Sequence, residues 1–269
     1  MHIHVLDQYQ GGDSPVHRLD PRVKLLMALA FILACALTPN GAWLAYAGLA
    51  VLWVVAVLLS DVPPGLLLRR GLLALPFALV AATVLFTVPG EPLLSFTVPV
   101  FNWQLAISDA GLIRFLSIML KSWLSVLMAL LLVATTTFPD LMHGLRGIGV
   151  PSVLVAVIGF MYRYIFVLAD EVVRLLRARE SRMAIGPPGQ RTGGSVAWRA
   201  KVAGGMVGSL FVRTLARSDR VYQAMTSRGY AGELRWLDKP QLRSSDVFMA
   251  GFFVLTLILI ELLARVMTA

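Results

Sequence analysis

The sequence predicts an all-α membrane protein that crosses the bilayer several times. Of its 269 residues, 58% are hydrophobic and only 14% are charged, and the mean hydropathy is +0.76. Soluble domains average about 25% charged residues, so an ordinary soluble enzyme is excluded. The apolar residues also form separate runs close to the length of about 20 residues that a membrane-spanning helix needs.

Five of these runs have the composition of transmembrane helices. They cover residues 23–39, 42–59, 72–88, 112–135 and 247–264. Pro76 lies inside the third run, which a membrane helix tolerates when neighbouring groups satisfy the freed carbonyl. Arg114 and Lys121 lie seven residues apart in the fourth run and share a face, and the sequence leaves open whether they face the protein interior or the membrane surface.

The distribution of basic residues predicts which side of the membrane each segment faces. Lys and Arg precede the first run and follow the second, whereas the connections at 38–41 and 89–108 contain none. The N-terminal segment is therefore placed in the cytoplasm, and five spans put the C-terminus outside. An interfacial loop or hairpin is expected over residues 92–105 on the outer side.

A sixth apolar run, residues 151–168, is predicted to begin a cytoplasmic helix. Residues 141–246 hold 16 of the 24 Lys and Arg residues, and a sixth span would move most of them outside. That arrangement opposes the positive-inside bias, and Arg163 within the run also argues against contact with lipid. Translocation of the charged segment stays open as the alternative, because long loops can cross despite their charge.

The predicted cytoplasmic domain contains one short and two long helices. They cover residues 138–147, 151–183 and 195–229. A loop rich in Gly and Pro separates the long helices, Ser195 is a favourable N-cap and Gly229 stops the second long helix. The domain map is an N-terminal segment at 1–22, four spans within 23–137, the cytoplasmic domain at 138–246 and the last span within 247–269.

Both long helices end in an arginine beside a small residue. The first ends in Ser181, Arg182 and Met183, and the second in Ser227, Arg228 and Gly229. Arginine is favoured at a helix C-terminus by the helix dipole, and its guanidinium binds carboxylates through paired hydrogen bonds. The repeat predicts a docking surface with two prongs, with Arg179 as an alternative to Arg182.

The second long helix also carries small residues early in its sequence. Gly204, Gly205 and Gly208 lie toward one side of the helix, and the spacing of Gly204 and Gly208 lets two helix backbones approach closely. These glycines are therefore predicted to permit the two long helices to cross.

Several motifs resemble the transmembrane T component (EcfT/CbiQ family) of energy-coupling factor (ECF) transporters, specifically the cobalt type. They are Leu19-Asp20-Pro21-Arg22 with Lys24, TTFPDLM at 136–142, GFMYRY at 159–164 and RSDRVYQAMTSRGY at 217–230. The resemblance covers nearly the whole chain. Met183 departs from the small third residue that is usual in the first arginine motif.

The resemblance implies a scaffold in the inner (cytoplasmic) membrane that joins two ABC ATPase subunits to a substrate-binding membrane subunit. The 138–246 domain would then be a coupling domain whose two long helices cross and dock on the ATPases. Cobalt uptake for cobalamin biosynthesis is the expected function, with nickel or a vitamin as alternatives and a small accessory membrane subunit as a further partner. No cofactor, metal site, catalytic residue or nucleic-acid partner is expected in this chain.

Two other classes of protein are less well supported. An integral membrane enzyme would need a HExxH, a GxSxG or paired carboxylates within the spans, and the sequence has none of these motifs. A stand-alone secondary transporter would show an inverted repeat, which we do not find among the spans. His2, His4 and His17 could bind a transition metal weakly, but the resemblance implies that the substrate-binding partner holds the ion.

Overall fold

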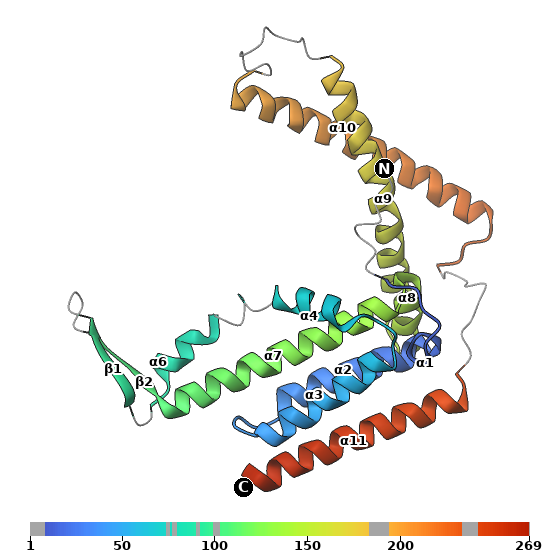
Figure 1. Ribbon diagram of the computed structural model, residues 1–269. Coiled ribbons are helices and arrows are strands. Elements are labelled where there is room, and N and C mark those ends of the chain that lie inside the picture. The colour runs from blue at the N-terminus through green and yellow to red at the C-terminus, as the bar shows by residue number, and fades with distance from the viewer. Residues whose placement is uncertain are drawn as a thin grey trace. The chain divides into compact units, whose positions relative to one another are not determined.

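The computed structural model confirms a predominantly helical fold. It describes residues 9–73, 76, 80–89, 92–98, 103–182, 194–232 and 242–268. The chain divides into two compact units, which Figure 1 shows in one view. The bundle comprises His2–Gly149 and Asp238–Ala269, and the long-helix unit comprises Val150–Leu237.

The bundle is built mainly from helices that match the predicted spans. Its elements are α1 (Pro15–Arg18), α2 (Pro21–Leu37), α3 (Trp43–Leu58), α4 (Pro64–Leu72), the 3-10 turn η2 (Val80–Thr83), α6 (Val84–Thr87), β1 (Pro92–Val98), β2 (Trp103–Ser108), α7 (Asp109–Thr135), α8 (Phe138–Gly147) and α11 (Ser244–Thr268). Four of the five predicted spans correspond to α2, α3, α7 and α11 to within a few residues.

The core of the bundle lies where α2, α3 and α7 meet. α2 contacts α7, α8 and α11, and α3 contacts α7 and α11. Among the larger side chains, Phe31, Cys35, Leu49 and Leu127 of these helices are almost fully buried, as is Leu67 of α4. Gly71 allows α4 to approach α7, because a Cβ at this position would lie 2.7 Å from Cδ2 of Leu127.

The described residues of the third predicted span, 72–88, do not form one continuous helix. α4 ends at Leu72, and the following described pieces are η2 and α6. Pro76 itself is helical, and the described irregularity is the 3-10 turn η2. Residues 74, 75 and 77–79 lie outside the described residues, so a membrane crossing here stays a prediction. Next along the chain, β1 and β2 pair antiparallel, which confirms the hairpin alternative for residues 92–105.

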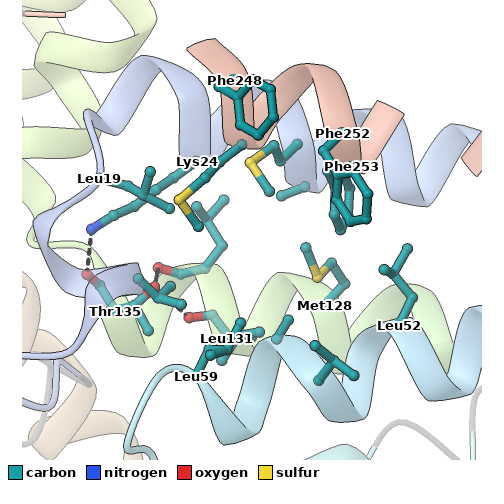
Figure 2. Close-up of a pocket in the computed structure, with 17 residues that line it drawn as sticks. Leu19, Lys24, Leu52, Leu59, Met128, Leu131, Thr135, Phe248, Phe252 and Phe253 are labelled. Atoms are coloured by element: carbon teal, nitrogen blue, oxygen red, sulfur yellow. Dashed lines mark hydrogen bonds between the residues drawn. The ribbon is translucent and has the colours of Figure 1, made fainter. Parts of the chain in front are cut away.

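An apolar cavity of about 220 Å³ lies between α11 and the rest of the bundle. Figure 2 shows Leu52, Met128 and Phe253 around this space. Phe252 also lines it and is 66% exposed. α11 is thus only partly covered by the other described helices, as expected for a helix whose outer face contacts lipid.

The long-helix unit consists of α9 (Ser152–Glu180) and α10 (Val196–Ser227), which cross in Figure 1. Seven α10 residues, spaced three or four apart on one face, are partly buried, whereas the rest of the helix is exposed. They are Val202, Met206, Leu210, Thr214, Arg217, Val221 and Met225. Arg213 donates to Oε1 of Glu171 at 2.9 Å and thereby links the two helices.

Three of the described helices are long and apolar enough to cross a membrane. They are α7, α9 and residues Ser244–Met267 of α11, and α3 is a shorter apolar helix. Because α9 qualifies by length and composition, the cytoplasmic placement of residues 151–168 stays a prediction.

The start of α2 is anchored to the end of α7 by a buried lysine. Lys24 is 7% exposed, and its ammonium donates to the carbonyls of His17 at 2.9 Å and Thr135 at 3.0 Å. Figure 2 shows the bond to Thr135, the last residue of α7. The last four carbonyls of a helix lack helical partners, so the lysine satisfies one that would otherwise be buried without a donor.

Replacing this lysine tests the anchor. Lys24→Met keeps most of the apolar side chain but leaves two carbonyls without their donor, which costs about 1–3 kcal/mol for each buried group. We expect the purified chain to unfold at a clearly lower temperature in detergent, followed by circular dichroism. Lys201→Met, on the exposed face of α10, is the matched control. Equal stability of the two variants would show that the Thr135 and His17 carbonyls do not depend on Lys24.

Candidate functional site

The C-terminal end of α9 presents the first predicted arginine motif. Ser181 caps the helix, and its hydroxyl donates to the carbonyl of Ala178 at 3.0 Å. The Arg182 amide donates to the carbonyl of Arg179 at 3.1 Å, while the Arg182 side chain is exposed. Met183 lies outside the described residues.

The C-terminal end of α10 presents the second motif and closes with a Schellman arrangement. The Gly229 amide donates to the carbonyl of Thr226 at 3.0 Å, and the Tyr230 amide donates to that of Met225 at 3.0 Å. Gly229 has a φ of +81°, a conformation that glycine adopts without the steric cost of a Cβ. The motif therefore needs its glycine to end the helix directly after Arg228.

The two helix ends share the same local hydrogen bonds. The Ser227 hydroxyl donates to the carbonyl of Ala224 at 3.0 Å, as Ser181 does to Ala178. The Arg228 amide donates to the carbonyl three residues earlier at 3.1 Å, as the Arg182 amide does. Both arginine side chains are exposed. The pattern Ala-x-x-Ser-Arg thus gives both helix ends the same serine and arginine hydrogen bonds, although α9 ends at Glu180 and α10 ends one position later in the pattern, at Ser227.

Arg179 differs from these two arginines. Its counterpart in α10 is Met225, and its side chain is half-buried against the hollow between α9 and α10. Its Nε is buried and has no hydrogen-bond partner among the described residues. Arg179 is therefore the more buried of the two arginines in this hollow, whereas Arg182, which also lines it, is exposed at the helix end.

The predicted crossing role of the glycines is not what the structure shows. A Cβ built on Gly204, Gly205 or Gly208 meets no described atom within 4 Å. The face of α10 that meets α9 instead carries larger side chains such as Met206 and Leu210. The two helices cross over these side chains, so their backbones do not need the close approach that the glycine spacing indicated.

The N-terminal motif, Leu19-Asp20-Pro21-Arg22, forms a second group of interacting residues. The sequence indicated this motif only through the family resemblance. Asp20 caps α2 by accepting from the Arg22 amide at 2.8 Å. Arg22 also donates from Nη2 toward Nε2 of His143 on α8, at 3.4 Å. Burial, followed by the neighbouring Arg22 charge, lowers the pKa of His143 and so favours the neutral imidazole, which can accept this bond.

α8 fits closely against the start of α2 because it carries two glycines. A Cβ at Gly144 would lie 3.0 Å from the Pro21 carbonyl oxygen, and one at Gly147 would overlap the Arg22 side chain. α8 packs as part of the bundle, and the cytoplasmic placement of residues 138–147 stays a prediction. A capping Asp before Pro could be predicted from sequence, whereas the contact with His143 could not.

Lys121 and Thr38, in the fourth and the first predicted spans, each have a polar partner in the bundle. Lys121 donates to Oδ1 of Asn40 at 3.1 Å, and Thr38 donates to Oε1 of Glu261 on α11 at 2.5 Å. Among the residues that the structure describes, no group of three or more His, Cys, Asp or Glu side chains could hold a metal ion. His2 and His4 lie outside that part of the chain.

The fold and the helix ends define a helical membrane protein that presents two matched arginine motifs on a separate unit. The sequence model of the cobalt transport protein family, CbiQ, matches residues 12–237. The chain belongs to this family, whose members are T components of energy-coupling factor transporters and are non-catalytic subunits.

Curated relatives match over most of their length. The energy-coupling factor transporter transmembrane protein EcfT of Listeria innocua is 31% identical over 240 residues, covering 85% of each chain. The EcfT of Lactococcus lactis is 29% identical and covers 95% of this chain and 96% of the relative. An uncharacterized protein of Methanocaldococcus jannaschii is 26% identical and covers 96% and 86%.

A pair of glycine variants tests the two roles assigned above. Gly229→Ala should destabilise the α10 end by about 1 kcal/mol, because a Cβ opposes the positive φ. Gly204→Ala should stabilise α10 by about 0.5–1 kcal/mol, since alanine favours a helix and meets no neighbour. Hydrogen–deuterium exchange of α10 peptides measures both changes. Faster exchange in Gly204→Ala would instead support the predicted close helix crossing at this glycine, because the added Cβ would then disturb it.

Proposed function

We propose that this T component transmits ATP-driven motion of two ABC ATPase subunits to a substrate-binding membrane subunit. Ser181 with Arg182 and Ser227 with Arg228 would dock on the two ATPases, one motif on each. The observation that carries this proposal is the match between the two helix ends, which present exposed arginines on the same hydrogen-bonded frame. One chain that meets two copies of a partner needs two equivalent contacts.

Arg182 is the better assignment for the first contact than Arg179. It occupies the position that Arg228 occupies in α10, and its guanidinium is exposed. Arginine suits this role because its fork donates two parallel hydrogen bonds to a carboxylate. Met183 and Gly229 complete the proposed motifs.

Cobalt is the proposed substrate, and the substrate-binding subunit is proposed to hold the ion. The support is the matching family, which is described as a cobalt transport protein. Nickel and a vitamin are the alternatives, and a small accessory membrane subunit is a further proposed partner. Uptake assays of the assembled complex with each substrate separate these possibilities.

The proposed topology places residues 1–22 and the long-helix unit in the cytoplasm, with five spans and an external C-terminus. The support is the concentration of Lys and Arg in residues 141–246. Within its own unit α9 leaves apolar side chains such as Val153, Val157 and Met161 exposed. These side chains are available to cover apolar surface elsewhere in the assembly.

Charge reversal tests the docking assignment. Arg182→Glu and Arg228→Glu should each lose one ATPase contact, because two carboxylates would then face each other, and the double variant should release both ATPases and abolish cobalt uptake. Co-purification of tagged chain with ATPases gives the stoichiometry. Arg199→Glu, an exposed α10 residue outside both motifs, should behave as the parent. Normal stoichiometry and uptake in the double variant would refute the docking role.

Cysteine labelling tests the proposed sides of the membrane. In a Cys35→Ser background, which removes the buried native thiol, Arg177→Cys and Gln223→Cys place single thiols near the two helix ends. A membrane-impermeant maleimide should label them only after the cells are permeabilised. Asn40→Cys, in the turn between α2 and α3, should label in intact cells. External labelling at position 177 or 223 would show that the long-helix unit lies outside.

A further inference from the structure

A polar hollow of about 730 Å³ lies between the C-terminal half of α9 and the N-terminal half of α10. Its lining includes four arginines, Arg174, Arg179, Arg182 and Arg213. It also includes the apolar side chains of Leu175, Trp198, Val202 and Met206. The hollow therefore combines positive charge with apolar side chains, one of which is aromatic.

The positive charge of the hollow is mostly unpaired. Glu171 is the single acidic residue of the lining, and Arg213 already donates to it at 2.9 Å. Four arginines against one glutamate leave the lining with a net charge of +3. Among the described residues, no carboxylate lies within ion-pair distance of Arg174, Arg179 or Arg182.

Arg179 supplies an independent sign that the hollow accepts an anion. Its Nε is shielded from solvent and has no hydrogen-bond acceptor among the described residues. A buried donor without an acceptor is costly, and an anion in the hollow would remove that cost. The guanidinium plane would then offer parallel N–H groups to two oxygens of one anion.

We propose that this hollow binds an organic phosphate, with its phosphate on Arg174 and Arg179 and its apolar part against Trp198. A phosphate offers three or more oxygens and up to two negative charges, so it can bind several guanidiniums at once, whereas a carboxylate offers two oxygens. The same chemistry belongs to a free phosphate monoester and to the monoester headgroup of phosphatidic acid. This site goes beyond ATPase docking, because it lies between the helices and its two proposed phosphate contacts, Arg174 and Arg179, are outside the motifs Ser181-Arg182 and Ser227-Arg228.

Binding of a free phosphate ester is measured on the purified full chain without ATPases, so the result does not depend on docking. The probes are adenosine diphosphate and inorganic phosphate, followed by isothermal titration calorimetry. Adenosine diphosphate should bind more tightly than inorganic phosphate, because its apolar part adds contact with Trp198. Trp198→Ala should bind adenosine diphosphate no more tightly than inorganic phosphate. If this variant still binds adenosine diphosphate as much more tightly as the parent does, the contact with Trp198 is refuted.

Variants of Arg174 and Arg179 test the phosphate contacts. Arg174→Gln with Arg179→Gln should weaken binding at least about 100-fold, since two charge-assisted contacts are lost. Arg179→Lys keeps the charge but not the fork, and should weaken binding about tenfold. Arg199→Gln carries the same charge change as Arg174→Gln outside the hollow and should bind as the parent. Equal weakening in Arg199→Gln would reduce the effect to general electrostatic attraction and refute the site.

A lipid arm identifies the source of the phosphate. The full chain is placed in nanodiscs of phosphatidylcholine with or without phosphatidic acid, and hydrogen exchange is measured over residues 174–182 and 198–209. Protection by phosphatidic acid that the double variant abolishes assigns a headgroup, and protection by adenosine diphosphate assigns a free phosphate ester. If neither ligand protects these residues and calorimetry shows no binding, the proposal is wrong.

Discussion

The interaction on which the bundle depends is the burial of the Lys24 ammonium against backbone carbonyls. Moving a charged amine out of water is expensive unless its donors are satisfied, and here the carbonyls of His17 and Thr135 accept from it. One side chain thereby closes the end of α7 and fixes α1 beside α2. Buried without acceptors, the ammonium would destabilise the bundle. Because it donates to Thr135, it instead links the first predicted span to the fourth.

The neighbouring residues extend this anchor to α8. Asp20 sets the first turn of α2, and Arg22 reaches His143 across the close contact that Gly144 permits. α8 is the last bundle element before the chain enters the long-helix unit at Val150. The short N-terminal motif therefore has a structural role: it fixes α8, the helix that precedes the long-helix unit along the chain.

The sequence predicted elements better than contacts. Apolar periodicity, a capping Ser195 and a terminal Gly229 are local signals, so the bounds of α8 and α10 agree with prediction to within two residues. Pairing between residues far apart in the chain has no such local signal, so the sequence does not predict the contact between Arg22 and His143. The predicted close crossing at the glycines of α10 fails for the same reason. GxxxG spacing permits a close approach, but it does not determine which face of α10 meets the partner helix.

The end of α9 shows how one helix can serve two kinds of contact. Arg179 and Arg182 are three residues apart, so on a continuous helix they would lie about 60° apart around the axis, on the same side. Capping by Ser181 ends the helix between them, which leaves Arg182 at the exposed terminus and Arg179 against α10. A basic residue count alone treats the two as equivalent. Their different burial makes them separable, because a ligand between the helices needs Arg179 and a partner at the helix end needs Arg182.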